Sequence, residues 1–161
     1  MRNNALDNGP SVRRTIRVAV WSPYKPLEQE LLELIRSTGS AETVGPLDGR
    51  PLPEAIRESG ADVLVVDVDG SPSGARELIG QILRSAQGVR ILAMSTHPDR
   101  RLVAGALEAG AVGYVLKECA FEDVPNAVHA MARNQCYLSP AIDDWNENCC
   151  KGSRSAESGQ S

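Results

Sequence analysis

The sequence ADVLVVDVDG, residues 61–70, contains the most informative stretch of the chain. Residues 63–66 form an uninterrupted apolar run, which is typical of a parallel strand buried on both faces. The run ends at Asp67, so a carboxylate is expected where this strand ends. A loop follows, and the leucines and isoleucines of residues 74–86 then recur at helical spacing. The stretch therefore predicts the central strand of an α/β fold, followed by an amphipathic helix.

The same strand-and-helix unit repeats on both sides of this stretch. Further strands are predicted at residues 16–21, 41–45, 89–94 and 111–117. Further helices are predicted at residues 27–37, 53–59, 99–109 and 121–133. Gly39, Gly60 and Gly110 each follow a predicted helix and act as stop signals.

Alternation of strands and helices with short links favours a parallel sheet with right-handed crossovers. Five such units predict a doubly wound sheet, either flavodoxin-like or Rossmann-like. In both folds ligands meet the carboxyl ends of the strands. The residues expected at that edge are Trp21, Ser22, Pro23, Asp67, Asp69, Ser95, Thr96, His97, Lys117 and Glu118.

Length and composition indicate one globular domain of 161 residues with a formal net charge of −4. We expect a flexible leader at residues 1–14, a domain at residues 15–142 and a disordered tail at residues 143–161. An acidic chain without a basic patch is a poor nucleic-acid binder. No apolar run is long enough to span a membrane and no signal peptide is visible, so a cytoplasmic protein is expected. In that reducing compartment its four cysteines should be free thiols.

Motifs of common enzyme classes are missing from the sequence. No Gly-x-Gly-x-x-Gly or P-loop pattern follows the first predicted strand, and no Gly-x-Ser-x-Gly pattern occurs. The chain is therefore not expected to be a metabolic enzyme. Because fold alone does not decide function, a small-molecule-binding module on a flavodoxin-like sheet remains an alternative.

Three motifs, in order, carry a family resemblance: DVLVVD at residues 62–67, ILAMS at residues 91–95 and ALEAGAVGYVLK at residues 106–117. Together with the ending YLSPAI, they resemble receiver domains of NarL/LuxR-type response regulators over about residues 15–142. The resemblance implies a flavodoxin-like (CheY-like) five-stranded parallel sheet of order 2-1-3-4-5. It also implies a role in two-component (phosphorelay) signal transduction.

The resemblance assigns roles to four residues. Asp67 would accept a phosphoryl group, Ser95 would supply the hydroxyl that moves to the phosphate, and Lys117 would ion-pair with it. Tyr114 would be the aromatic residue whose orientation reports the signalling state. Each has a plainer interpretation as well: Asp67 and Ser95 as loop or cap residues, Lys117 as a solvated lysine and Tyr114 as ordinary packing.

The sequence departs from the receiver pattern after the first strand. Receivers carry there an acidic pair that holds Mg²⁺, whereas this chain has Ser22 and Pro23. Mg²⁺ prefers carboxylate and water oxygens in octahedral geometry. Asp67 and Asp69 are left as candidate ligands for at best weak Mg²⁺ binding. We therefore expect poor phosphorylation and a degenerate receiver, or pseudo-receiver.

A second departure concerns output. NarL-type regulators continue into a helix-turn-helix domain, and residues 143–161 are too few to form one. A stand-alone domain is therefore expected to act through another protein, either a histidine kinase or a partner regulator, or to form a homodimer. The family uses the fourth helix, fifth strand and fifth helix for such contacts, and Arg100, Arg101, Leu102 and Tyr114 should lie near that face. No direct binding to nucleic acid or membrane is expected.

Overall fold

The computed structural model describes residues 15–45, 47, 49–70 and 74–142. The predicted leader, residues 1–14, and the predicted tail, residues 143–161, lie outside the described residues.

Within the described chain, one parallel sheet has the strand order β2-β1-β3-β4-β5-β6. Its strands are β1 (Ile16–Trp21), β2 (Ala41–Thr43), β3 (Val63–Asp67), β4 (Arg90–Ser95), β5 (Gly113–Leu116) and β6 (Tyr137–Leu138). The predicted order 2-1-3-4-5 is confirmed. The sixth strand was not predicted, because a strand of two residues is too short to leave a periodic pattern. It runs parallel to β5, with Gly113 opposite Tyr137.

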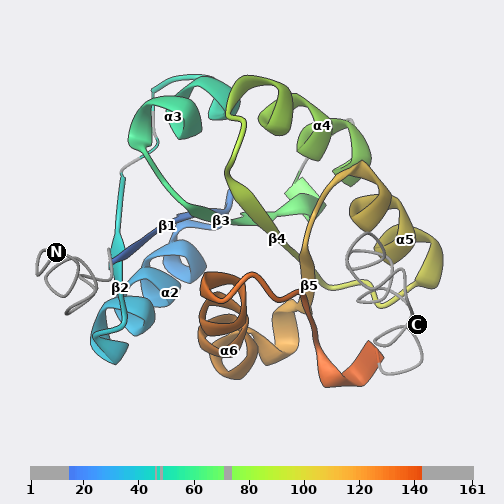
Figure 1. The fold of residues 1–161 in the computed structure, drawn as a ribbon. Coiled ribbons are helices and arrows are strands. Elements are labelled where there is room, and N and C mark those ends of the chain that lie inside the picture. The colour runs from blue at the N-terminus through green and yellow to red at the C-terminus, as the bar shows by residue number, and fades with distance from the viewer. Residues whose placement is uncertain (1–14, 46, 48, 71–73, 143–161) are drawn as a thin grey trace, which may run out of the picture.

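Helices cover both faces of the sheet, as a doubly wound fold requires (Figure 1). One face carries α3 (Leu52–Ser59), α4 (Ala75–Ser85) and α5 (Arg100–Ala109), and the other carries α2 (Lys25–Thr38) and α6 (Ala120–Ala132). None of these helices is long and apolar enough to cross a membrane. All five were predicted, with boundaries that differ by two residues or fewer.

The apolar run of β3 is divided between two cores. Leu64 and Val66 face a cluster that includes Ile79 of α4, whereas Val63 and Val65 face a cluster that includes Leu31 of α2. All four strand residues are fully buried. Because both faces of the strand are covered, the run shows no polar alternation, which confirms the interpretation of residues 63–66 as a central strand.

Glycines end three of the helices as expected, and Gly60 follows α3 with φ 74°. Gly39 follows α2 with φ 72°, and Gly110 follows α5 with φ 122°. These left-handed backbone conformations suit a residue without a Cβ atom. At Gly110 a Cβ atom would also lie 2.4 Å from the Leu83 side chain. The turn after α5 therefore depends on glycine both for its conformation and for its close approach to α4.

Candidate functional site

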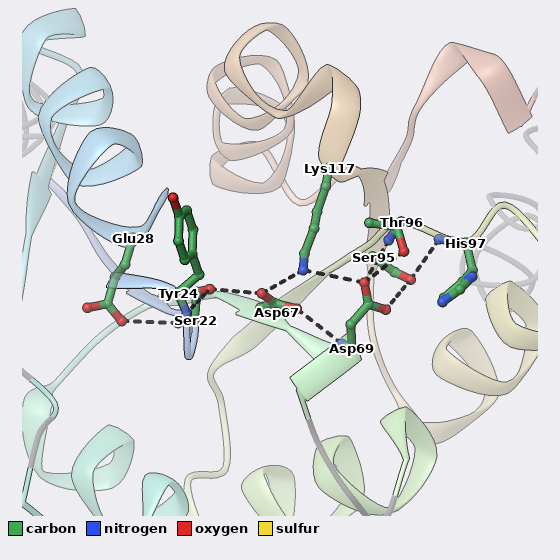
Figure 2. Close-up of polar contacts among 9 residues, drawn as sticks. All are labelled: Ser22, Tyr24, Glu28, Asp67, Asp69, Ser95, Thr96, His97 and Lys117. Carbon is green, nitrogen blue, oxygen red and sulfur yellow. Dashed lines mark hydrogen bonds and ion pairs between the residues drawn. The ribbon is translucent and has the colours of Figure 1, made fainter. Parts of the chain in front are cut away.

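The carboxyl ends of β1, β3, β4 and β5 bring together the polar residues that the sequence singled out (Figure 2). Asp67 is the last residue of β3, and Asp69 lies in the short 3-10 turn Val68–Gly70 that follows it. Ser95 ends β4, and Lys117 begins the turn after β5. Register explains the convergence, because Asp67 pairs with Met94 and Ser95 pairs with Leu116 in adjacent strands.

Asp67 is a buried carboxylate, and both of its oxygens accept hydrogen bonds from the chain. Its side chain is 1% exposed. Oδ2 accepts a hydrogen bond of 2.8 Å from the Ser22 hydroxyl and lies 2.8 Å from Nζ of Lys117. Oδ1 accepts a hydrogen bond of 3.1 Å from the backbone N–H of Asp69. The buried charge is thus paired and hydrogen-bonded, as burial of an ionised group requires.

Asp69 binds the end of β4 more closely than the sequence indicated. Its Oδ1 accepts a hydrogen bond of 2.6 Å from the Ser95 hydroxyl, and its Oδ2 accepts one of 2.9 Å from the backbone N–H of Thr96. The Thr96 hydroxyl lies 3.1 Å from Oδ2, and Nζ of Lys117 lies 3.4 Å away. Burial raises the pKa of Asp69, but these hydrogen bonds and the Lys117 charge outweigh it and lower the pKa below its usual 3.8.

Lys117 is the cation shared by the two aspartates (Figure 2). Burial lowers the pKa of Lys117, but the hydrogen bond and charge of Asp67, together with Asp69, outweigh it and raise the pKa above 10.5. The ammonium group is therefore held in its charged form at neutral pH. The structure places Lys117 beside Asp67, as predicted, and its role toward a phosphoryl group stays a prediction.

A hydrogen-bonded path leads from Ser95 to Tyr114. The Ser95 hydroxyl accepts a hydrogen bond of 3.0 Å from the backbone N–H of His97, and the Tyr114 hydroxyl donates one of 2.8 Å to the His97 carbonyl. Tyr114 is 1% exposed and belongs to the core, and burial raises its pKa above 10.0. The sequence placed His97 at the strand-end edge. It is exposed there, and its backbone connects the two predicted switch residues.

The loop after β1 places Ser22, not a carboxylate, against Asp67. Ser22 is fully buried, and its hydroxyl also accepts a hydrogen bond of 3.0 Å from the Tyr24 backbone N–H. Glu28 of α2 accepts a hydrogen bond of 3.0 Å from the Ser22 backbone N–H and pairs with Lys25. Glu28 was missed by the sequence analysis, because its approach depends on how α2 begins. It fixes the loop and makes no contact with Asp67 that would replace an acidic pair.

The donor set does not fit Mg²⁺. This ion prefers several carboxylate and water oxygens in an octahedral arrangement. Asp67 and Asp69 instead accept hydrogen bonds on all four carboxylate oxygens and share the Lys117 ammonium. Among the described residues, no group of three or more His, Cys, Asp or Glu side chains could hold a metal ion. A cation placed here would have to displace Lys117 or compete with it.

The structure also places Trp21 and two of the cysteines. Trp21 packs against the core on the side of α3 and α4. Cys119 is a free thiol but Cys136 is disulfide-bonded, so the expectation of free thiols is wrong for Cys136. That expectation rested on the assumed compartment and not on geometry.

Two hollows lie away from the site, at the β2 edge. Their volumes are about 400 and 380 Å³; both flank Thr43 and Val44, and neither is lined by Asp67 or Lys117.

No protein-family model matches the chain. Among curated proteins, the chain is similar to the transcriptional regulatory protein UhpA of Salmonella typhimurium, with 31% identity over 112 residues. The match covers 69% of this chain and 51% of UhpA, so the chain spans about half the length of this relative.

Among solved structures, a LuxR-family two-component response regulator from Aurantimonas sp. has a TM-score of 0.71 and 22% identity, covering 81% of this chain and 94% of that one. The signal receiver domain of the putative response regulator NarL from Mycobacterium tuberculosis has a TM-score of 0.61 and 25% identity. The match covers 74% of this chain and 98% of that one. The first of these likenesses supports the fold alone. Taken with the sequence relatives, they show that the homologues of this chain are NarL/LuxR-family response regulators and that the chain matches their receiver domain.

Proposed function

We propose that this receiver domain is a pseudo-receiver, which signals by binding another protein and does not require phosphorylation of Asp67. The observation that supports this most is the engagement of both Asp67 oxygens by Ser22, Lys117 and the Asp69 backbone N–H. Phosphoryl transfer to a carboxylate needs a free nucleophilic oxygen and cations that screen two negative charges. Here one lysine must serve both aspartates, and the acidic pair that would hold a divalent ion is replaced by Ser22 and Pro23.

A partner surface is proposed on the side of α5, β5 and α6. Arg100 and Arg101 are exposed at the start of α5, and Leu102 is 45% exposed, which suits a mixed basic and apolar contact. β6 lies along β5, so β5 itself is not an open edge. Tyr114 is buried and would influence a partner only through the His97 loop. Candidate partners are a histidine kinase, another regulator or a second copy of this chain, in the cytoplasm.

A phosphorylation-controlled receiver is the second candidate. It is favoured by the assembly of Asp67, Ser95 and Lys117 at one edge of the sheet. The two candidates differ in one testable respect. A controlled receiver must bind Mg²⁺ and a phosphoryl group at Asp67, whereas a pseudo-receiver need not do so.

Beryllofluoride with millimolar Mg²⁺, which imitates a phosphoaspartate, separates the two candidates. We expect no change in the backbone amide NMR shifts of the wild-type protein. The double variant Ser22→Asp/Pro23→Asp rebuilds an acidic pair and should gain shifts at Asp67, Ser95 and Lys117. Adding Asp67→Ala to that variant should abolish them. Shifts in the wild-type protein that disappear in Asp67→Ala would overturn the pseudo-receiver proposal.

A further inference from the structure

We infer that the carboxylate of Asp69 is a built-in anion, which holds the loop after β4 and Tyr114 in place of an added phosphoryl group. The inference rests on the proposed function, since it supplies the reason why phosphorylation is not required. It concerns Asp69, which has no assigned role in the family resemblance beyond weak metal binding.

Three kinds of donor converge on the Asp69 carboxylate. They are the Ser95 hydroxyl at 2.6 Å, the Thr96 backbone N–H at 2.9 Å and the Lys117 ammonium at 3.4 Å. Proteins bind anions with converging donors of these kinds: hydroxyls, backbone N–H groups and ammonium groups. Hydrogen bonds to an ionised acceptor are stronger than those between neutral groups. The set is complete within the chain, so Ser95 and Thr96 need no external anion.

The position of this anion matters because Lys117 joins it to Asp67. Nζ of Lys117 is 2.8 Å from Asp67 and 3.4 Å from Asp69. A phosphoryl group carried on Asp67 would bring its negative charge to the same ammonium and to the same side of the sheet edge. Asp69 already supplies a negative charge there, so a further anion would be repelled and would find its donors occupied.

The Asp69 contacts extend to the core through two residues of the loop. The Ser95 hydroxyl donates a hydrogen bond to Asp69 and accepts one from the backbone N–H of His97. The His97 carbonyl accepts a hydrogen bond from the Tyr114 hydroxyl. Ser95 and Tyr114 are each 1% exposed, so the path runs from the site to a buried ring. The same loop leads to Asp99, which caps α5 by accepting the Arg101 backbone N–H at 2.8 Å. The conformation that Asp69 imposes is thereby passed to the start of the proposed partner surface.

The variant Asp69→Ala tests the inference by NMR and amide hydrogen exchange. Loss of a hydrogen bond to a charged acceptor should speed exchange of the Thr96 amide about tenfold or more. The ring signals of Tyr114 and the amide of His97 should shift with it. Inorganic phosphate at millimolar concentration should restore the Thr96 and His97 signals in Asp69→Ala and leave the wild-type protein unchanged.

Two further variants keep the test sharp. Asp69→Asn preserves size and folding while removing the charge, and should change the same signals in the same direction. Glu118→Gln removes an exposed carboxylate one residue beyond Lys117 and should leave Thr96, His97 and Tyr114 unchanged.

The inference is overturned if Thr96, His97 and Tyr114 keep their wild-type signals in both Asp69 variants. It is also overturned if the signals change but phosphate does not restore them, because the three donors then do not form an anion site. The proposed function is tested separately by the silence of the wild-type protein toward beryllofluoride. A silent wild-type protein with unaffected Asp69 variants would retain the pseudo-receiver and remove the role of Asp69.

Discussion

At the scale of single residues, Lys117 has the largest electrostatic role, because it compensates two carboxylates of which one, Asp67, is 1% exposed. Replacing Lys117 by Met should lower the free energy of unfolding by about 2–3 kcal/mol, somewhat less than the roughly 3–5 kcal/mol of a broken buried pair, since Lys117 is 22% exposed. Asp67→Asn should cost less, about 1 kcal/mol. In the double variant the cost should be smaller than the sum, because the neutral amide that Asp67→Asn introduces needs no counter-charge.

Urea unfolding of the two single variants and the double variant measures this coupling. Lys25→Met is the matched control: Lys25 is 46% exposed and pairs with Glu28, so its loss should change stability by at most about 0.5 kcal/mol. Strictly additive costs would show that Lys117 and Asp67 do not depend on each other.

The lowered pKa of Asp69 predicts a pH dependence of stability. A group whose pKa is lower in the folded state stabilises the fold above its unfolded pKa, here 3.8, and this contribution is lost as pH falls through the folded value. The stability of the wild-type protein should therefore fall more steeply than that of Asp69→Asn on acidification from about pH 5 to pH 2. Chemical denaturation across this range provides the measurement, with Glu118→Gln as a control for the loss of one negative charge. Equal slopes for wild type and Asp69→Asn would contradict the prediction.

At the scale of elements, β6 is attached to the first turn of α6 through Asp123. This carboxylate is 4% exposed and accepts hydrogen bonds from Tyr137 at 3.0 Å and from Ser139 at 2.5 Å. The Ser139 hydroxyl in turn accepts a hydrogen bond of 3.0 Å from the backbone N–H of Leu116. Ser139 is the residue directly after the two paired residues of β6. Burial, with the hydrogen bond and charge of Asp123, raises the pKa of Tyr137 to about 12. This strand of only two residues is thus held by side chains as well as by its backbone pairing with β5.

Asp123→Asn should loosen this attachment. We expect a loss of about 1–3 kcal/mol in the free energy of unfolding, because one of the two hydroxyls that bind Asp123 loses its acceptor. Removing the carboxylate charge should also lower the pKa of Tyr137 from about 12 toward 10.0. In the wild-type protein this raised pKa contributes stability below pH 10.0 that is lost as pH rises through about 12. Ultraviolet absorbance of tyrosinate during an alkaline titration measures the shift.

The two hydroxyls that bind Asp123 can be distinguished by exchange of the Leu116 amide. Ser139→Ala removes its acceptor and should speed the exchange, whereas Tyr137→Phe leaves the Ser139 bond in place and should change it little. Similar effects of both variants would show that β6 loosens as a whole and that Ser139 has no separate role.

The same elements show what the sequence could predict and what it could not. The apolar run of residues 63–66 predicted a central strand, and strand ends then predicted that Asp67, Ser95 and Lys117 would meet. Periodicity reports burial, so it could not show that the Asp69 carboxylate turns to Ser95 and Thr96, which depends on the backbone of two loops. Periodicity also missed β6. Helical spacing places Asp123 on one face of α6, but it does not show that this carboxylate binds the Ser139 hydroxyl next to β6.

At the scale of the whole molecule, the doubly wound sheet determines which residues can share a site, since they come from the carboxyl ends of several neighbouring strands. A substitution after β1 therefore alters chemistry at β3, far along the chain: the Ser22 hydroxyl donates to Asp67 with a sequence separation of 45. The two apolar cores on either side of the sheet do not include Ser22 or Pro23, so the residues of this edge can vary while the packing of the sheet is kept.

This separation of fold from site predicts how Mg²⁺ affects thermal unfolding of the entire domain. A ligand that binds only the folded state stabilises it in proportion to the logarithm of its concentration, by about 1.4 kcal/mol at ten times its Kd. The wild-type protein should show no change in Tm with millimolar Mg²⁺, because its carboxylate oxygens are already bound by its own donors. Ser22→Asp/Pro23→Asp should be less stable without metal, since three or four carboxylates then face one lysine, and should gain several degrees when Mg²⁺ is added. Replacing Mg²⁺ by Na⁺ at the same ionic strength, in a buffer without Ca²⁺, controls for the screening of charges by salt. A rise in Tm of the wild-type protein that Na⁺ does not reproduce would show that Mg²⁺ can displace Lys117, and that the receiver keeps a working metal site without its acidic pair.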